Sequence, residues 1–342
     1  MRRRTLLAGI TSAALITATP AHARSHRILH VRPGDSLQAA VDAVDGTGGT
    51  IVVHPGTYRE VVNVPPEKGE LTIRGASRDP RAAVLVFDNA NGTARPDGSG
   101  TYGTAGSATF TSAAPGLTVR DLTLANDWLR ADHPEITGTQ AVAAYVTGDR
   151  THFDNVRLLA HQDTLFADTT ALDAFDRQYF HRCYIEGDVD FVFGRGRAVF
   201  DACHFHTLQR DVTFTPKGMV FAPATARANP YGFLALRGRI TSGAEDAAYK
   251  IARPWVPSYE TTAWPSLVVR DTWIGPGIDA VTPYTNMRDA YPWQTMRFRE
   301  HANSGPGAVI PVPENRPQLT AEEAATHTRR TYLGDWRPYG RP

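Results

Sequence analysis

Short runs of apolar and β-branched residues recur between Gly, Asp and Asn, and they constrain the fold more than any other feature of the chain. Such runs are typical of β-strands. Helical periodicity between residues 50 and 280 is weak, so we expect an all-β protein. The predicted strands are residues 50–54, 71–74, 83–87, 117–124, 152–159, 179–185, 198–205, 233–240 and 267–274.

The spacing of these runs resembles that of a solenoid. Apolar anchors near the ends of successive runs are separated by 34, 27, 20, 35 and 34 residues; they are Leu124, Leu158, Ile185, Phe205, Ile240 and Ile274. A minimum near 20 with variable additions fits the coils of a parallel β-helix, whose extra residues form loops. An antiparallel sandwich or barrel also has many short strands. Few tight Asn-Gly or Asp-Gly hairpins join the runs, which favours the β-helix.

The two ends of the predicted stack differ from its middle. Residues 36–43 are expected to form a short helix, capped by Ser36, that covers the first coil. Near the C-terminus, Thr320 and Glu323 form a capping-box pattern, which predicts a tail helix lying against the stack. Residues 24–342 are expected to be one domain without a linker.

The first 23 residues have the pattern of a secretory signal. Three arginines at positions 2–4 precede an apolar run to about residue 18, and Ala21-His22-Ala23 resembles a cleavage site. The adjacent arginines resemble a twin-arginine signal, with an ordinary Sec signal as the alternative. Removing residues 1–23 changes the balance from 36 basic and 35 acidic residues to 33 and 35, a net charge of −2. No later run is long enough to span a membrane, so we expect a secreted, extracellular protein.

Composition and missing motifs exclude several classes of protein. The near-neutral charge argues against a general nucleic-acid binder. The sequence contains no G-x-S-x-G, H-E-x-x-H or G-x-x-x-x-G-K motif. The two cysteines, Cys183 and Cys203, are 20 residues apart and are predicted to occupy the same position in successive coils. Two arrangements are open for them, a disulfide between neighbouring strands or two buried thiols.

A few polar residues interrupt the apolar strands, and they are the candidates for chemistry. They are Gln140, Gln162, Asp163, Asp190, Arg253 and the nearby Trp255. A carboxylate within an apolar strand is costly unless it is paired. Taken singly, the aspartates could cap turns, Gln140 could be a stacked amide, and Arg253 could be a surface arginine. On one face of stacked coils they would instead form a polar cleft suited to nucleophilic and acid–base catalysis without serine or metal.

These motifs occur together in an order that resembles the pectin methylesterases (pectinesterases), a family of carbohydrate esterases with a right-handed parallel β-helix. The resemblance runs from about residue 28 to 338. The strings that carry it are G-T-Y-R-E at 56–60, Y-G-T-A-G-S-A-T-F at 102–110, Q-A-V-A-A from 140, H-Q-D-T-L-F from 161, C-Y-I-E-G-D-V-D-F-V-F-G from 183, A-R-P-W from 252, N-S-G-P-G-A at 303–308 and L-G-D-W at 333–336.

The resemblance implies a role for each catalytic candidate. Asp190 would be the nucleophile that attacks the C6 ester carbonyl of methylated galacturonate. Asp163 would protonate the departing methanol and then activate water, so its pKa should be raised. Gln140 and Gln162 would donate to the oxyanion. Arg253 would orient Asp190 and keep it ionised, since a neighbouring positive charge lowers the pKa of a carboxyl.

The same resemblance implies the substrate and its contacts. The substrate would be methyl-esterified homogalacturonan (pectin), with no nucleic acid, membrane, cofactor or metal involved, and the protein is expected to be a monomer. The expected substrate-binding residues are Trp255, Phe166, Phe193, Thr104, Ala105, Val189 and Arg210.

Two departures from the family pattern stand out. Ala252 precedes the Arg-Pro-Trp string, where the family usually has glycine, and we expect the extra methyl to be tolerated. Asp163 and Asp190 are 27 residues apart, which is longer than usual. The additional residues fall at about 167–177 and include Asp168, Asp173 and Asp176. A solvated loop that rims the cleft is expected there, in preference to a metal site.

Three rival functions fit the predicted fold. A polysaccharide lyase would act by calcium-assisted β-elimination with a basic residue, which the Gln/Asp/Asp/Arg set argues against. A hydrolase of other esters or acyl thioesters would share the catalytic residues but differ in substrate preference. A non-catalytic wall-binding β-helix would be expected to lack a carboxylate or the arginine.

Overall fold

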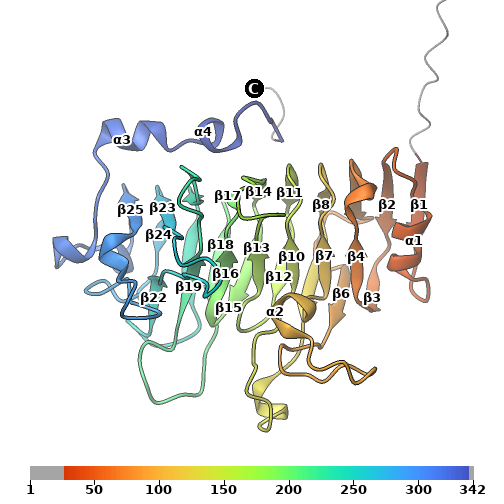
Figure 1. The fold of residues 1–342 in the computed structure, drawn as a ribbon, viewed down its shortest axis with the longest axis horizontal. Helices are drawn as coiled ribbons and strands as arrows, with labels where there is room; N and C mark the ends of the chain where they lie inside the picture. Colours follow the sequence, from red (N-terminus) through yellow and green to blue (C-terminus); the bar gives the residue numbers. More distant parts are fainter. Residues whose placement is uncertain (1–26, 339–342) are drawn as a thin grey trace, which may run out of the picture.

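The strands stack into three parallel sheets that together form a long prism (Figure 1). The computed structural model describes residues 27–338. Along the chain, each coil contributes one strand to a first sheet (sheet A), one to a second (sheet B) and one to a third (sheet C) before the next coil begins. Every strand pair within the three sheets is parallel, with successive coils paired in register. The predicted parallel β-helix is therefore confirmed.

The strands of the three sheets have the following bounds. Sheet A contains, in spatial order, β1 (Arg27–Val31), β2 (Gly49–Val53), β5 (Leu71–Gly75), β8 (Thr118–Arg120), β11 (Thr151–Asp154), β14 (Arg177–His181), β17 (Arg197–Asp201), β20 (Phe233–Leu236), β23 (Ser266–Arg270) and β25 (Arg297–His301). Sheet B contains β3 (Gly56–Arg59), β6 (Ala83–Phe87), β9 (Thr123–Asn126), β12 (Arg157–Leu159), β15 (Tyr184–Gly187), β18 (His204–Thr207), β21 (Arg239–Ser242) and β24 (Trp273–Ile274). Sheet C contains β4 (Val62–Val64), β7 (Phe110–Ser112), β10 (Ala144–Val146), β13 (Leu165–Ala167), β16 (Val189–Gly194), β19 (Gly218–Pro223) and β22 (Tyr249–Ala252).

The six predicted anchors form one column in the core. Each anchor pairs with the next across sheet B: Leu124, Leu158, Ile185, Phe205, Ile240 and Ile274. All six are buried within the largest apolar cluster of the protein. The period-two alternation of a strand turns these side chains inward, and the parallel register stacks them one above another. The variable intervals in the sequence are therefore coils of a single repeat with loops of different length.

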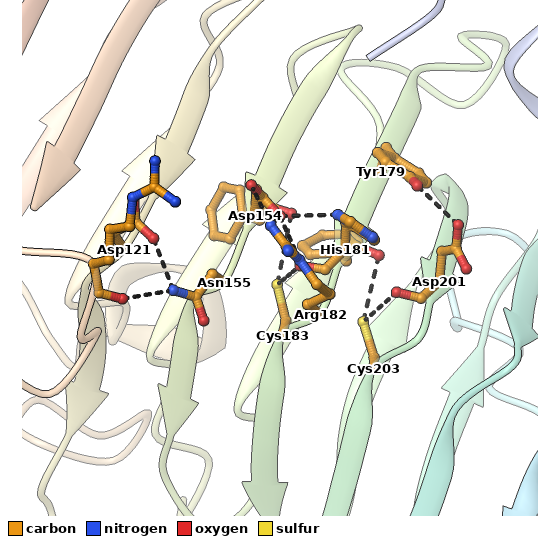
Figure 2. Close-up of polar contacts among 12 residues, drawn as sticks. Asp121, Asp154, Asn155, Tyr179, His181, Arg182, Cys183, Asp201 and Cys203 are labelled. Carbon is orange, nitrogen blue, oxygen red and sulfur yellow. Dashed lines mark hydrogen bonds and ion pairs between the residues drawn. The ribbon is translucent and has the colours of Figure 1, made fainter. Parts of the chain in front are cut away.

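The prediction that each longer run forms one strand was wrong, because each run forms two strands. Residues 117–124, for example, divide into β8 and β9, and residues 179–185 into β14 and β15. The bend between sheets A and B is a residue in the left-handed region, such as Asp121 (φ 58°), Asn155 (φ 55°) or Arg182 (φ 51°). None of these is a glycine or proline. Asp121 and Asn155 are residue types that tolerate the left-handed region, whereas Arg182 carries no such signal. Figure 2 shows several of these bends side by side in neighbouring coils.

As predicted, one helix covers the first coil and a helical tail lies against the stack. Ser36 caps α1 (Leu37–Ala43) by accepting from the Ala39 amide, and Leu37 and Val41 pack into the first coil. Thr320 and Glu323 form the capping box of α3 (Ala321–Thr326). The tail then forms α4 (Arg329–Leu333) and runs back along the outside of the stack (Figure 1). Tyr332 and Leu333 of the tail pack against apolar side chains on the outer face of sheet A, which include Tyr179, Val199, Leu234 and Val268.

The remaining helical elements are single turns. They are α2 (Gly103–Gly106), η1 (Pro66–Lys68), η2 (Arg130–Asp132), η3 (Trp293–Thr295), η4 (Pro306–Ala308) and η5 (Pro313–Asn315). Within residues 27–338, no helix is long and apolar enough to cross a membrane. The expected signal of residues 1–23 lies outside the described residues.

The two cysteines occupy the predicted equivalent positions in successive coils. Cys183 precedes β15 and Cys203 precedes β18, and the first residues of these strands pair with each other. Both side chains are buried free thiols in the structure, not a disulfide. Each thiol lies near a backbone carbonyl of the preceding coil, that of Phe153 for Cys183 and that of Phe180 for Cys203 (Figure 2).

The anchor column predicts where the fold is most sensitive. Ile185→Ala removes a fully buried side chain from the middle of the column and leaves a cavity. We expect the free energy of unfolding to fall by about 2–5 kcal/mol, measured by urea denaturation. The matched control is Ile28→Ala, because Ile28 lies on β1 with 57% of its surface exposed and should lose little. Equal losses in the two variants would contradict the assignment of the column as the core.

Candidate active site

The predicted catalytic residues line one cleft along the outer face of sheet C. A cavity of about 440 Å³ is lined by all five of them, Gln140, Gln162, Asp163, Asp190 and Arg253. A second cavity of about 400 Å³ adjoins it, because Gln162 and Arg253 line both. The seven predicted substrate-binding residues divide between the two: Thr104, Ala105, Phe166, Phe193 and Trp255 line the first, and Val189 and Arg210 the second. The structure thus brings every predicted site residue together.

The backbone at both aspartates departs from regular strand geometry. Asp163 (φ 67°) and Asp190 (φ 50°) are both in the left-handed region. In addition, β16 has one more residue than β19 between two paired positions, so Asp190 lies on a β-bulge. Bulges redirect side chains, and left-handed non-glycine residues persist only where the surroundings hold them. Here the surroundings include the bond from the Asp163 amide to the Val189 carbonyl, which ties the two aspartate segments together.

Arg253 forms a bidentate ion pair with Asp190. Its Nε donates to Oδ1 at 2.9 Å and its Nη2 donates to Oδ2 at 2.6 Å. The arginine follows β22, whose last residue, Ala252, pairs with Phe221 in the core. The methyl group that replaces the usual glycine is therefore accommodated by core packing. A paired guanidinium of this geometry fixes the orientation of a carboxylate as well as its charge.

The two aspartates differ in their electrostatic environment. Burial and the neighbouring Asp190 charge raise the pKa of Asp163 well above its ordinary value, as expected for an acid. Burial also raises the pKa of Asp190, although the hydrogen bonds and charge of Arg253 lower it. The effect of Arg253 thus has the expected sign, but burial outweighs it. Because only Asp190 has an arginine bonded to it, Asp190 is the carboxyl that ionises first.

Both glutamines are held by their carbonyl oxygens. Asn91 donates to Oε1 of Gln140 at 2.8 Å, and the Thr139 hydroxyl donates to Oε1 of Gln162 at 2.7 Å. Within residues 27–338, no protein group accepts a hydrogen bond from either amide nitrogen. Each Nε2 group therefore remains available as a donor in the cleft, which is the arrangement an oxyanion requires. Asn91 and Thr139 were not identified from the sequence, and their loop positions carry no strand-like signal.

Stacked aromatic rings form one wall of the cleft. Phe166 and Phe193 are paired in register on neighbouring strands, and their centroids are 4.2 Å apart. Trp255 packs against both rings in tilted or edge-on contact. Such surfaces suit the apolar faces of sugar rings. The sequence did not identify other lining residues, which are Ala222, Tyr259, Met287, Phe214, Pro216, Lys217, Gly218, Met219, Thr285 and Asn286.

A largely buried ion pair lies next to the two candidate catalytic carboxylates. Arg130 of η2 makes a bidentate pair with Asp188, at 2.5 and 2.8 Å, and His161 lies 3.7 Å from the same carboxylate. These contacts lower the pKa of Asp188 despite its burial, so it is an anion. Its negative charge contributes to raising the pKa of both Asp163 and Asp190. The sequence did not reveal this pair, because its partners are 58 residues apart.

The additional residues at 167–177 lie at the turn from sheet C to sheet A. None of residues 168–176 lines either cleft cavity, so the expected rim is not formed by them. Asp168 is buried in a bidentate pair with Arg195, whose guanidinium in turn lies over Tyr259 in the cleft wall. Asp176 accepts from the backbone and hydroxyl of Thr170. The influence of this loop on the cleft is therefore indirect, through Arg195.

The raised pKa of Asp163 has a consequence for stability. Between the ordinary and the raised pKa, the folded protein holds a proton that the unfolded chain releases, so this group lowers the free energy of unfolding as pH rises. Asp163→Asn removes that loss. Measured by urea unfolding, we expect the variant to gain stability relative to the parent as pH is raised from about 4 to 7.

Asp190→Asn is the control for this prediction. That variant leaves the partly buried Arg253 without its counter-charge and should destabilise the protein. A stability difference between Asp163→Asn and the parent that does not change with pH would contradict a raised pKa.

Comparisons with known proteins identify the family of the chain. The family model described as Pectinesterase matches residues 34–336. Pectinesterase A of Dickeya chrysanthemi is 32% identical over 342 aligned residues, which cover 89% of each chain. The pectinesterase of Ralstonia solanacearum is 31% identical and covers 80% of this chain and 76% of the relative.

Comparison with solved structures identifies the same family. The pectin methylesterase from Erwinia chrysanthemi has a TM-score of 0.78 at 28% identity, covering 91% of this chain and 97% of that one. A pectin methylesterase in complex with a hexasaccharide also has a TM-score of 0.78 at 28% identity, covering 89% and 94%. The chain therefore belongs to the pectinesterase family of carboxylic ester hydrolases and has the right-handed parallel β-helix of that family.

Proposed function

We propose that the protein hydrolyses the methyl esters of galacturonate in pectin, releasing methanol and de-esterified pectin. One observation carries the proposal: an arginine-paired carboxylate, Asp190, lies in the same cleft as Asp163, whose raised pKa keeps it protonated. These two carboxyl groups suit the roles of nucleophile and acid. The relative solved with a hexasaccharide supports an oligosaccharide substrate for a cleft of this kind.

The reaction follows from the two protonation states. An Asp190 oxygen attacks the C6 carbonyl carbon, and the carbonyl oxygen takes the negative charge. The tetrahedral species collapses as Asp163 gives its proton to the methoxy oxygen, so methanol leaves and an acyl-enzyme anhydride remains. Asp163, now ionised, removes a proton from water, which attacks the substrate carbonyl and releases Asp190. Both aspartates return to their starting states.

The amide groups of Gln140 and Gln162 supply the oxyanion donors in this scheme. Because their carbonyl oxygens are already bonded to Asn91 and Thr139, little reorganisation is needed when charge develops. One such donor is typically worth about 3–4 kcal/mol in the transition state.

We also propose that the protein acts outside the cell as a monomer. The basic, apolar and small-residue segments of positions 1–23 support export. Detecting the mature protein in the medium of the source organism, beginning near residue 24, tests the export, and the molecular mass of the purified protein in solution tests the monomer.

The principal test is methanol release from highly methylated pectin. We expect Asp190→Ala to reduce the rate by more than about a thousandfold, because the nucleophile is lost. The matched control is Asp149→Ala, which also breaks a bidentate Arg–Asp pair. That pair, with Arg177, lies away from the cleft, so we expect the control to retain activity. Methanol release by folded Asp190→Ala would overturn the assignment of Asp190 as the nucleophile. An unsaturated, ultraviolet-absorbing product would instead indicate a lyase, and a preference for acyl thioesters a different hydrolase.

The support of Gln162 gives a second prediction. Thr139→Val removes the hydroxyl that fixes the Gln162 amide, so kcat should fall about tenfold with little change in KM, because only part of one oxyanion donor is lost. Thr139→Ser retains the hydroxyl and should restore kcat. If valine and serine have the same effect, Thr139 does not act through this hydrogen bond.

A further inference from the structure

A second hollow surface runs along the turns that join sheet A to sheet B. Two cavities of about 600 and 650 Å³ adjoin there, because Asn155 and Arg182 line both. We call this surface the arginine trough. Its lining residues include Arg74, Arg78, Arg81, Arg120, Arg157, Arg182, Arg237 and Arg239.

The trough is separate from the catalytic cleft. In each coil the chain passes from sheet A to sheet B, then to sheet C, and back to sheet A. The edge between A and B is therefore the one edge of the prism that sheet C does not border. The cleft lies on sheet C, and the two surfaces share no lining residue.

The trough concentrates positive charge on a nearly neutral protein. The chain has 36 basic and 35 acidic residues, yet the trough is lined by eight arginines and only two aspartates, Asp121 and Asp154. Both aspartates are engaged: Asp121 accepts from Asn155, and Asp154 from His181 and Arg182 (Figure 2). Two further carboxylates pair with trough arginines: Asp201, which is fully buried behind Arg237, and Asp79, which lies 3.7 Å from Arg81.

Most of the arginines are not neutralised within the protein. Among the described residues, no carboxylate lies within 4 Å of the guanidinium nitrogens of Arg74, Arg78, Arg120, Arg157 or Arg239. Arg78, Arg120 and Arg239 are exposed, so they can reach a ligand. Clustered like charges of this kind repel one another unless an anion binds between them.

The spacing of the arginines points to an extended ligand. Arg74, Arg78 and Arg81 come from one coil, and Arg120, Arg157 and Arg182 come from the next three coils. Arg237 and Arg239 follow beyond the β17–β18 turn, which carries no arginine. Coils of this kind stack about 4.8 Å apart. The positive groups therefore recur along the length of the trough. A linear polymer with a negative group on every unit matches this pattern. Guanidinium groups suit carboxylates in particular, because they bind them in a planar, bidentate manner.

We propose that the arginine trough binds de-esterified galacturonan through its carboxylates, as a second polysaccharide site. The proposal rests on the proposed function, because that reaction creates carboxylates on the polymer that the cleft has processed. Binding a freed stretch at the trough would keep the enzyme on its substrate while the cleft acts on a methylated stretch. The interaction should weaken as salt is added, because the arginines are exposed.

The test compares two variants that remove the same charge. The trough variant is Arg78→Gln/Arg120→Gln/Arg239→Gln. The control is Arg227→Gln/Arg299→Gln/Arg330→Gln, which replaces three exposed arginines outside the trough, none within 4 Å of a described carboxylate. Binding to long de-esterified oligogalacturonate is measured by calorimetry, and methanol release is measured separately on a short methylated oligosaccharide. Matching melting temperatures show that the variants fold.

We expect the trough variant to bind the long oligogalacturonate about tenfold more weakly, because three charge-assisted contacts are lost, while its methanol release is unchanged. The control variant should bind like the parent. Equal weakening in both variants, or in neither, would overturn the proposal. Equally tight, trough-dependent binding of DNA or of a sulfated polysaccharide would overturn the assigned partner.

The two proposals fail in different ways. A parent protein that releases no methanol but binds oligogalacturonate through the trough would refute the proposed function alone. If the parent protein releases methanol normally but the trough variant binds oligogalacturonate as tightly as the parent, only the proposal of the trough as a binding site is refuted.

Discussion

Hydrogen bonds between successive coils are the constraint on which the rest of this protein depends. They pair each strand in register with the strands of the preceding and following coils, so each side chain stands in a column. Inward columns, such as the one through Ile185, make the core. Outward columns bring together residues that are far apart in sequence, such as Asp190 and Arg253. The same register produces the stable interior and the cleft.

The cleft departs from that regularity where chemistry is needed. Asp163 and Asp190 both have left-handed backbones, and a bulge redirects the second. Arg253 is bonded to Asp190 and leaves Asp163 without a directly bonded cation. Two identical side chains thereby acquire different electrostatic surroundings, and the pKa of Asp163 is raised well above its ordinary value. The buried anion Asp188, paired with Arg130, strengthens the tendency of Asp163 to keep its proton.

The sequence predicted the repeat, the anchors and the capped ends, because these depend on local patterns. The candidate catalytic residues followed from motifs that resemble a known family, and the structure places them together. The sequence did not predict the bends at Asp121, Asn155 and Arg182, because a single Asp or Asn within an apolar run, or an arginine, does not distinguish a bend from a continuous strand. Nor did it predict the contacts made by Asn91 and Thr139, which form only when loops from different coils meet. Longer-range proximity of this kind is not encoded in local periodicity.

The central claim is that Asp190 is ionised while Asp163 holds a proton. An NMR titration of protein labelled with ¹³C at the aspartate carboxyl groups tests it most directly, with the two signals assigned from Asp163→Asn and Asp190→Asn. The account predicts that the Asp190 signal titrates at the lower pH and that Asp163 titrates well above the ordinary range of an aspartate. Reversal of that order, or an ordinary pKa for Asp163, would contradict the assigned roles of both residues.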